Sequence, residues 1–419
     1  MNKRRIIVIG GGAAGMMAAG QAALTGAQVL LLEKMNRPGR KLAITGKGRC
    51  NLTNIAEVKE FIDHFGPNSR FLRQAFSAFF APELMAFLEQ QGLELVNERG
   101  GRVFPASGKA PEVVKAFHQW LLRCGVQIKT TTPVELLLTT NGRISGVLAN
   151  NETLPGDAVI LATGGASYAA TGSSGDGYRL AAAVGHTIVP IRPALVPLEI
   201  AGELTAPMDG LDLRNVNVRL LENGKRRRQE FGEMSFTKFG VTGPVLLTLS
   251  GKVVDGLRSG SNMALSIDLK PALDEQKLEA RLLRDLESRH KEKMDSVLRG
   301  LLPREMIPIC LKLNDIPEDR LAGQVTAKER KRLKTWLKDF RLPISGHRPF
   351  SEAIITAGGV DLKEVDPRTM ESRKAHGLYL AGEVLDIQGD TGGYNLQAAF
   401  STGWLAGRSA ALGPDSETK

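Results

Sequence analysis

Three glycines near the start of the chain, Gly10, Gly12 and Gly15, have the spacing that binds the pyrophosphate of a dinucleotide. Gly10 permits a tight turn, Gly12 lets a pyrophosphate approach the backbone, and Gly15 lets the following helix pack closely on a sheet. Glu33 ends the next apolar run, where its carboxylate would accept hydrogen bonds from an adenosine ribose and disfavour a 2′-phosphate. The alternative is a glycine-rich turn with a purely structural role. Because the glycines and the acidic residue occur together, we favour dinucleotide binding.

The elements that must position these residues lie in the same stretch of sequence. The run RIIVI at 5–9 predicts a strand, the Ala- and Met-rich stretch up to Thr25 predicts a helix, and the apolar run at 28–32 predicts a second strand. Strand, helix and strand together form a βαβ unit, which opens a parallel sheet. The helix N-terminus supplies free N–H groups and a partial positive charge for phosphates. We therefore expect an α/β fold with a Rossmann-like domain around a central parallel sheet.

Two later motifs resemble those of two-dinucleotide-fold flavoproteins, and they favour FAD over NAD. The apolar run 159–162 predicts a buried strand that ends in 163–165, Thr-Gly-Gly, which resembles the turn where such chains cross back beneath the cofactor. The segment 380–397 resembles the closing flavoprotein motif, in which an acidic residue binds the ribityl chain. The helix that follows would direct its N-terminus at the flavin pyrimidine edge, where it stabilises the negative charge that develops on reduction.

The chain as a whole resembles the BaiN/RdsA-like family of NAD(P)/FAD-dependent oxidoreductases, within the glutathione-reductase-type group. The resemblance spans essentially the whole chain and rests on GGGAAG (10–15), RPGRKLAITGKGRCNLTN (37–54), ATGG (162–165), TGSSGDGYRLAAAVGH (171–186), TAGGV (356–360) and GEVLDIQGDTGGYNLQAAFSTG (382–403). GKGRCNLTN and GDTGGYNLQ are specific to the family. TGSSGDGY and TAGGV also resemble fumarate-reductase-like flavoproteins, which act on C=C bonds. The resemblance implies an FAD domain that is split by an inserted β-barrel-like and helical domain.

The resemblance also implies which residues bind the FAD. In the N-terminal part these are Gly10, Gly12, Ala13, Ala14, Gly15, Glu33, Lys34, Arg40, Lys41, Gly46, Gly48, Arg49 and Asn51. Val134 would lie beside the adenine, and Thr163 and Gly164 would touch the AMP half of the cofactor. In the C-terminal part, the residues near the ribityl chain, the pyrophosphate and the flavin ring are Gly382, Glu383, Asp386, Gly393, Tyr394, Asn395 and Leu396. For the segment 34–54, the alternative is a solvated basic loop.

The candidate catalytic residues are Cys50, Tyr394 and His347. Cys50 lies in a motif expected near the isoalloxazine, either as a polarisable lining residue or as a reactive thiol. Disulfide exchange has no resolving partner, because no second cysteine is close in sequence. Tyr394 and His347, which precedes Arg348, are candidates for orienting the substrate or transferring a proton; the alternatives are a packing tyrosine at a helix start and a loop histidine. The six histidines form no metal-like pair, so no metal site is predicted.

The pattern of the sequence changes twice along the chain. Residues 1–190 predict the first part of the FAD-binding domain. An inserted substrate domain is predicted for residues 191–345, with alternating β-like runs at 191–270 and charged helical patterns at 271–345. Short buried strands and a final helix return at 346–419, which predicts the second part of the FAD-binding domain.

Composition narrows the class of protein. With 42% hydrophobic and 24% charged residues among 419, disorder and fibrous repeats are excluded. The three cysteines, Cys50, Cys124 and Cys310, include no C-x-x-C pair, which argues against a disulfide framework and fits the cytoplasm. The uncharged stretch 6–32 is assigned to the βαβ unit, so no membrane partner is predicted. A net charge of +10 permits nucleic-acid binding, but its densest run, Arg37–Arg49, is assigned to the pyrophosphate.

Three functions stay open at this point. In the first, FAD takes a hydride from NAD(P)H and passes it through flavin N5 to a small unsaturated or carbonyl-containing substrate. NAD(P)H would dock transiently, because the chain carries one convincing dinucleotide fingerprint. In the second, a small amine reduces the FAD and O₂ reoxidises it. The third is a tRNA-modifying flavoprotein that binds RNA through 225–228 and 328–338, but these segments lack interleaved aromatic residues for stacking, so nucleic acid is the least favoured partner.

Overall fold

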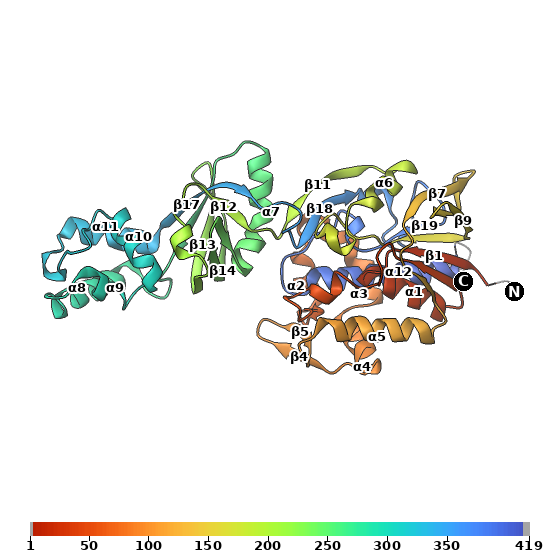
Figure 1. The fold of residues 1–419 in the computed structure, drawn as a ribbon, viewed down its shortest axis with the longest axis horizontal. Helices are drawn as coiled ribbons and strands as arrows, with labels where there is room; N and C mark the ends of the chain where they lie inside the picture. The colour runs from red at the N-terminus through yellow and green to blue at the C-terminus, as the bar shows by residue number, and fades with distance from the viewer. Residues whose placement is uncertain (1–2, 414–419) are drawn as a thin grey trace. The chain divides into compact units, whose positions relative to one another are not determined.

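A computed structural model describes residues 3–413 of the chain, and these residues divide into two compact units (Figure 1). Within the described part of the chain, unit 1 contains residues 3–193 and 350–413, and unit 2 contains Ala194–Pro349. The assignment of an FAD-binding domain and a substrate domain to these units stays a prediction. Among the described residues, no helix combines the length and the apolar character needed to cross a membrane.

Unit 1 is built around a five-stranded parallel sheet with the strand order β19-β10-β1-β2-β6. Its strands are β1 (Arg5–Ile9), β2 (Gln28–Leu32), β6 (Gln127–Lys129), β10 (Ala158–Leu161) and β19 (Leu378–Leu380). Ile9, at the end of β1, lies opposite Leu32 of β2 and Leu161 of β10. The loops that follow these three strands therefore gather at one edge of the sheet, as in other doubly wound folds. The predicted Rossmann-type α/β class is confirmed.

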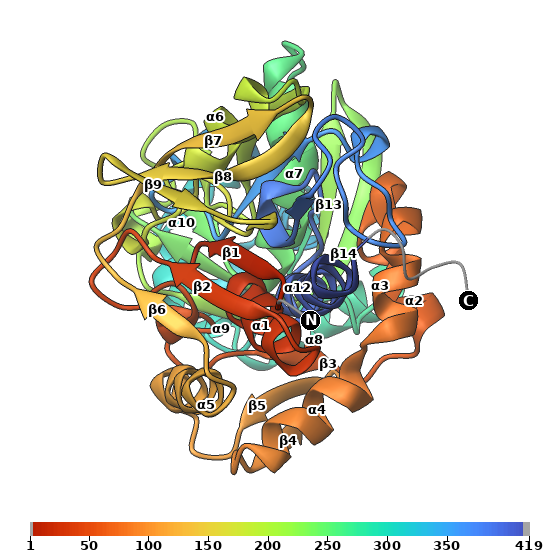
Figure 2. The same cartoon turned by 90° about the vertical axis from the view of Figure 1, so that its right-hand side faces the viewer.

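Two helices of unit 1, α1 (Ala13–Leu24) and α12 (Tyr394–Leu412), run side by side (Figure 2). Gly403 of α12 lies so close to α1 that an added Cβ would overlap the carbonyl oxygen of Ala14. Gly407 has the same relation to the carbonyl oxygen of Ala18. Because both contacts advance by one helical turn in the same direction, the two helices are parallel. Their glycines and alanines permit this close approach.

Three smaller sheets complete unit 1. The first sheet contains β7 (Val134–Thr140), β8 (Arg143–Ala149) and β9 (Glu152–Pro155). The second contains β3 (Thr53–Asn54), β4 (Leu95–Glu98) and β5 (Arg102–Pro105). The third pairs β11 (Ile188–Ala194) with β18 (Ile355–Val360). Asn141 and Gly142 have positive φ angles of 51° and 75° and form the tight turn between β7 and β8. Strands β6 and β7 belong to different sheets, because the backbone turns between them at Thr131 (φ 54°) before Pro133.

The other α-helices of unit 1 are α2 (Val58–Asp63), α3 (Arg73–Ala78), α4 (Ala81–Gln90), α5 (Ala110–Arg123) and α6 (Asp176–Ala183), and the short 3-10 helices η1 (Leu42–Ile44) and η2 (Gly66–Leu72) lie among them. Helices α3 and α4 are separated at Phe79, whose backbone is extended. The ring of Phe76 packs against Phe61 and Phe80, with centroids 5.2 and 5.3 Å apart. Aromatic packing thus folds this segment back on itself.

Unit 2 contains a closed antiparallel barrel with the strand order β12-β15-β14-β13-β16-β17. Its strands are β12 (Leu198–Ile200), β13 (Asp212–Glu222), β14 (Lys225–Thr237), β15 (Gly240–Thr242), β16 (Met263–Asp268) and β17 (Phe340–His347). The prediction for 191–270 is corrected in one respect, since a helix, α7 (Pro244–Arg258), lies within it. Val245, Leu249 and Val253 give α7 a buried face with helical spacing, which the short β-like runs around it obscured.

The helical part of unit 2 contains α8 (Glu275–Ser288), α9 (Met294–Leu298), α10 (Ile307–Leu313) and α11 (Ala327–Lys338). A capping box starts α11: the N–H of Glu329 donates to Thr326 Oγ1, and the N–H of Thr326 donates to Glu329 Oε2 at 2.8 Å. The prediction for 271–345 is corrected at its end, where β17 supplies the barrel strand that pairs with both β12 and β16.

Candidate functional site

The three glycines of the loop between β1 and α1 have different surroundings. Gly10 has a φ of 102°, and an added Cβ would lie 2.5 Å from the carbonyl oxygen of Ala162. A Cβ on Gly15 would overlap the carbonyl oxygen of Gly10. An added Cβ on Gly12 would meet no atom within 4 Å, so open space lies in front of the first turn of α1. Gly10 and Gly15 therefore allow close packing, whereas Gly12 leaves room for a ligand at a helix N-terminus.

Glu33 is held rigidly beside this loop, although its side chain carries a charge. The residue is 9% exposed, and its Oε2 accepts a hydrogen bond from the N–H of Gly11 at 2.7 Å. Its Oε1 accepts a hydrogen bond from the N–H of Met35 at 2.8 Å. Each carboxylate oxygen has a second lone pair, which can accept a hydrogen bond from a ribose hydroxyl.

Two lysines of the segment after Glu33 reach acidic residues that are distant in sequence. Lys34 Nζ pairs with Asp176 at the start of α6, and Lys41 Nζ lies 3.0 Å from Glu383 Oε2. Partial burial of Asp176 opposes ionisation, but the hydrogen bond and the charge of Lys34 outweigh it and lower the pKa of the carboxyl. These ion pairs bring the TGSSGDGY and GEV motifs next to the basic segment.

Strand β18 orients the two acidic residues of the closing motif. The N–H of Thr356 donates to Glu383 Oε1 at 2.6 Å, and the N–H of Gly358 donates to Asp386 Oδ1 at 3.1 Å. Asn68 Nδ2 donates to Asp386 Oδ2 at 3.0 Å. The sequence marked TAGGV as a motif, but the roles of its backbone N–H groups and of Asn68 were not predicted.

The segment that includes Asn51 reaches the N-terminus of α12. With its amide oriented to satisfy both of its polar atoms, Asn51 donates to the carbonyl oxygen of Thr53 at 3.1 Å and accepts from the N–H of Gly393 at 3.0 Å. Gly393 has a φ of 102°, and a Cβ there would overlap the carbonyl oxygen of Thr53. Asn54 Nδ2 donates to the carbonyl oxygen of Gly392 at 3.2 Å. The GKGRCNLTN and GDTGGYNLQ motifs thus meet at this helix N-terminus.

Cys50 belongs to the GKGRCNLTN motif, and its side chain is fully buried. Burial raises the pKa of the thiol to about 12, although a hydrogen bond with Thr45 acts in the opposite direction. The thiol is therefore protonated at neutral pH, and the nucleophilic thiolate is disfavoured. Of the two expected roles, this environment suits the lining residue; a catalytic role for Cys50 stays a prediction.

Tyr394 is the first residue of α12, and its ring is buried. It stacks on His64 with ring centroids 3.9 Å apart and an interplanar angle of 23°, and Phe61 meets it edge-on at 4.7 Å. Burial raises the pKa of its phenol to about 12, and the charges of Glu60 and Asp390 act in the same direction. His64 was not among the predicted residues, since nothing in the local sequence links it to α12.

His347 belongs to unit 2, where it ends β17. Its Nδ1 lies 3.0 Å from the carbonyl oxygen of Arg348. Arg348 Nη1 donates to Glu199 Oε1 at 3.0 Å, and its guanidinium lies 4.4 Å from the ring centroid of Phe239. The role of His347 in catalysis stays a prediction.

Among the other predicted contacts, Arg49 has partners within the protein. Its guanidinium pairs with Glu98 of β4 and lies 4.4 Å from the ring centroid of Phe104 in β5. Arg40 Nη1 donates to Asn36 Oδ1 at 3.3 Å. The binding of a cofactor by either arginine therefore stays a prediction.

Two further residues predicted to contact the cofactor, Val134 and Thr163, lie at the ends of strands in unit 1. Val134 is the first residue of β7 and pairs with Ala149 of β8. Thr163 follows β10, and its buried hydroxyl has no hydrogen-bond partner among the described residues. Gly177 of α6 packs directly against that hydroxyl, so α6 is held close to the end of β10.

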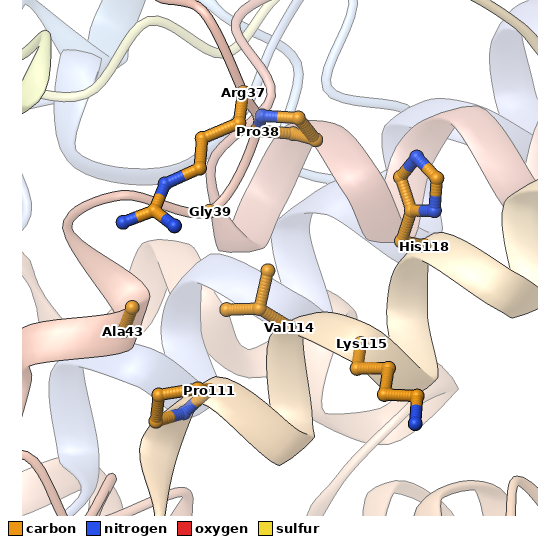
Figure 3. A pocket seen from close by; sticks show the side chains of 8 residues that line it. All are labelled: Arg37, Pro38, Gly39, Ala43, Pro111, Val114, Lys115 and His118. Carbon is orange, nitrogen blue, oxygen red and sulfur yellow. The ribbon is translucent and has the colours of Figure 1, made fainter.

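A hollow of about 290 Å³ opens between the loop after β2 and one face of α5 (Figure 3). Its lining residues are Arg37, Pro38, Gly39, Ala43, Pro111, Val114, Lys115 and His118. The side chains of Arg37 and Lys115 point away from each other, so these two cations do not converge on one ligand. Within residues 3–413, no group of three or more His, Cys, Asp or Glu side chains is arranged to hold a metal ion.

Comparisons with known proteins agree with this arrangement. The sequence model described as HI0933-like protein Rossmann domain matches residues 4–409. The 3-dehydro-bile acid delta(4,6)-reductase of Clostridium scindens is 36% identical over 98% of this chain and 100% of that protein. The ribosomal RNA dihydrouridine synthase of Escherichia coli is 30% identical over 96% of this chain and 97% of that protein.

A solved structure shows the same fold at lower identity. The open conformation of a flavocytochrome c3 fumarate reductase matches with a TM-score of 0.50 and 16% identity, over 98% of this chain and 78% of that chain. The family match and both relatives extend over nearly the whole sequence. The chain therefore belongs to the HI0933-like Rossmann family, the BaiN/RdsA-like group of flavin-dependent oxidoreductases that its motifs indicated.

Proposed function

We propose that unit 1 binds FAD along α1 and α12, and that the enzyme uses electrons from NAD(P)H to reduce a C=C bond conjugated to a carbonyl group in a small substrate. The observation that carries the cofactor assignment is the offset between the two parallel helices. Ala14 lies in the first turn of α1, yet its neighbour Gly403 lies in the third turn of α12. At 1.5 Å per residue, α12 therefore begins about 12 Å before α1 along their common direction.

This offset suits a cofactor that has phosphates at one end of an extended linker and an electron-accepting ring at the other. The open space at Gly12 would accommodate the pyrophosphate at the N-terminus of α1, and Glu33 would bind the adenosine ribose. The Lys41–Glu383 pair would lie along the connecting ribityl chain. Gly393 precedes α12, whose N-terminus would face the pyrimidine edge of the flavin.

When bound, FAD would accept two electrons from a nicotinamide and deliver them as a hydride to the substrate. The residues of this chain hold and orient it. The positive end of the α12 dipole favours negative charge on the ring, and the buried, protonated Cys50 adds no competing charge beside it.

The substrate class is supported by what the names of the two relatives have in common. The delta(4,6) bonds of a 3-dehydro-bile acid are conjugated to the 3-oxo group, and dihydrouridine is the product of reducing the C5=C6 bond conjugated to a uridine carbonyl. Hydride addition to such a bond gives an enolate, which a proton then quenches. We infer that this chain performs the same class of reduction. Its substrates would then be among the small unsaturated compounds expected from the sequence.

Anaerobic stopped-flow measurements on the yellow protein would test the proposal. NADH or NADPH should bleach the flavin absorbance near 450 nm, and a 3-oxo-4,6-diene steroid should restore it. Bleaching by small amines with rapid recovery in O₂ would instead support the amine oxidase. No bleaching by either nicotinamide would overturn NAD(P)H as the reductant.

RNA is the second candidate substrate, because one relative acts on ribosomal RNA according to its name. The basic turn of the β13–β14 hairpin is partly neutralised, since Arg227 pairs with Glu222 and Arg228 with Glu230, both at 2.6 Å. On α11, Arg330 and Lys334 both pair with Glu279. Because these cations are already paired with carboxylates of the protein, they are less available to bind the phosphates of RNA. The pairs therefore favour a small substrate over RNA. A gel-shift series with ribosomal RNA at rising salt separates the two, because phosphate contacts give a steep salt dependence.

We place this reaction in the cytoplasm, where NAD(P)H is available. The cysteines support this location, because Cys50, Cys124 and Cys310 are all free thiols and two of them are buried.

A further inference from the structure

A histidine and an aspartate far apart in sequence form a pair at the N-terminus of α12. His64 directly follows α2, and Asp390 lies in the loop before α12. His64 Nδ1 lies 3.1 Å from Asp390 Oδ2, and the N–H of Asp390 donates to the carbonyl oxygen of His64, also at 3.1 Å. Two contacts of this kind, one between side chains and one between backbones, fix the position of the imidazole.

The ring of His64 is also fixed in orientation. It stacks on Tyr394, which is itself held edge-on by Phe61. With Nδ1 facing Asp390, the carboxylate selects the tautomer that carries its proton on Nδ1 when the ring is neutral, and Nε2 carries a second proton when the ring is cationic. Within the described part of the chain, Nε2 has no hydrogen-bond partner, and 31% of the side chain is exposed.

The loop that carries Asp390 is clamped to α12. Asn395 Oδ1 accepts from the N–H of Gly389 at 2.7 Å, and Asn395 Nδ2 donates to the carbonyl oxygens of Gly389 at 2.9 Å and Asp390 at 3.1 Å. The pair is therefore rigidly attached to the helix end that we assign to the flavin ring. Two further acidic residues, Glu60 and Asp63, lie on α2, the helix that His64 follows.

We propose that His64 is the proton donor of the reduction and that Asp390 is its positioning residue. This inference rests on the reduction of a conjugated C=C bond proposed above. That reaction adds a hydride to the β-carbon and forms an enolate, which needs one proton at its α-carbon. The Nε2–H bond of the His64 imidazolium breaks, a C–H bond forms at the α-carbon, and the neutral imidazole regains a proton from water at its exposed edge. The electrons come from NAD(P)H through the cofactor, so atoms and charge balance.

The alternative is a histidine that only packs on Tyr394, and His64→Gln separates the two roles. If His64 is the proton donor, His64→Gln should slow the reoxidation of the reduced enzyme by a 3-oxo-4,6-diene steroid about a hundredfold. The affinity for FAD and the rate of reduction by NAD(P)H should stay within twofold of the wild-type values. His376→Gln, at an exposed histidine of unit 1, is the matched control and should leave all three unchanged.

Asp390→Asn tests the positioning role of Asp390. It also gives a second, independent test if His64→Gln fails to fold. It should slow reoxidation about tenfold and move the alkaline limb of the pH–rate profile to lower pH, because the imidazolium loses its negative neighbour. A packing role would leave the pH profile where it is.

A binding measurement gives a readout that needs no turnover. The phenolate of a substituted phenol imitates the enolate, and its contact with oxidised flavin gives a long-wavelength charge-transfer band. His64→Gln should weaken phenol binding about tenfold, because the cation that stabilises the phenolate is gone. Reoxidation and phenol binding by His64→Gln within twofold of wild type would overturn the assignment of His64. A wild-type protein that neither enone nor nicotinamide affects would overturn the proposed function as well, so the two failures are distinguishable.

Discussion

A Cβ added to Gly403 in α12 would overlap the carbonyl oxygen of Ala14 in α1, so these two helices are in backbone contact near the proposed phosphate site. This contact sets the distance between the two helix N-termini that the proposed FAD site requires. Small residues at the contact are therefore a condition for cofactor binding as well as for packing.

Gly403→Ala should separate α1 from α12, because the added methyl group has no space. We expect a loss of about 1–3 kcal/mol in the free energy of unfolding, as for other overpacked sites, and weaker FAD binding. Urea unfolding followed by circular dichroism, together with FAD titration, measures both effects. The control is Gly251→Ala within α7, where an added Cβ meets no atom within 4 Å. This substitution should raise the free energy of unfolding by about 0.5–1 kcal/mol. Equal effects in the two variants would contradict the contact.

Glu33→Gln should weaken FAD binding, and it should also lower the free energy of unfolding, because one of the two backbone N–H groups bound by the carboxylate would face the amide NH₂. The carboxylate that is proposed to accept the ribose hydroxyls loses its charge, and hydrogen bonds to charged groups contribute about 1.5–3 kcal/mol, which is roughly 10- to 150-fold in Kd. Quenching of FAD fluorescence on titration with apoprotein measures the change. Glu152→Gln, whose side chain is 67% exposed, makes the same chemical change and should bind FAD as the wild type does. An unchanged Kd for Glu33→Gln would remove Glu33 from the site.

Cys50 should resist thiol reagents in the folded protein. Burial raises the pKa of its thiol to about 12, so between pH 6 and pH 9 almost no thiolate forms. Ellman's reagent at pH 8 should modify the half-exposed Cys124 first, and Cys50 and the buried Cys310 only after unfolding. Peptide mapping by mass spectrometry identifies the labelled residue. Cys50→Ala should retain FAD reduction by NAD(P)H within about threefold; a loss of a hundredfold or more would support a reactive thiol.

The stability of unit 1 should fall as the pH is lowered through the range in which histidine titrates. His186 is buried, with Nε2 2.7 Å from Ser372 Oγ and Nδ1 3.2 Å from Glu364 Oε2. Burial lowers the pKa of its imidazole below the ordinary 6.5, although Glu364 acts in the opposite direction. Below pH 6.5 the unfolded chain therefore binds a proton that the folded chain does not, so the free energy of unfolding decreases as the pH falls toward the folded pKa.

Urea unfolding between pH 7.5 and pH 5.5 measures this slope. His186→Gln should lower stability at pH 7.5 and flatten the dependence, whereas the exposed His376→Gln should retain it. A His186→Gln profile parallel to that of the wild type would assign the slope to other groups.

Local sequence patterns were sufficient to predict the elements around the glycine loop. The RIIVI strand, the turn at Gly10 and the alanine-rich helix are encoded within a few tens of residues, and β1, α1 and β2 follow them closely. The strand preceding Thr163 was predicted for the same reason. Helix α7 was not predicted, because its helical pattern lies between β-like runs on both sides.

Features that depend on tertiary contacts were not predictable from one sequence. The ends of the β17 strand are specified by its partners β12 and β16, which lie far away in the chain. His64 carries no motif of its own, and its contact with Asp390 exists only because α2 packs against the start of α12. The hydrogen bonds from β18 to Glu383 and Asp386 likewise form only in the folded unit.

The division of unit 1 around unit 2 also determines an order of biosynthesis. The ribosome completes residues 194–349 before it makes β19 and α12, yet those late elements supply an edge strand of the parallel sheet and the partner of α1. The small-residue face of α1 therefore stays uncovered on the nascent chain while unit 2 can already fold. We therefore expect the cofactor to bind only after translation is complete, and proteins truncated before α12 to be colourless and to need chaperones.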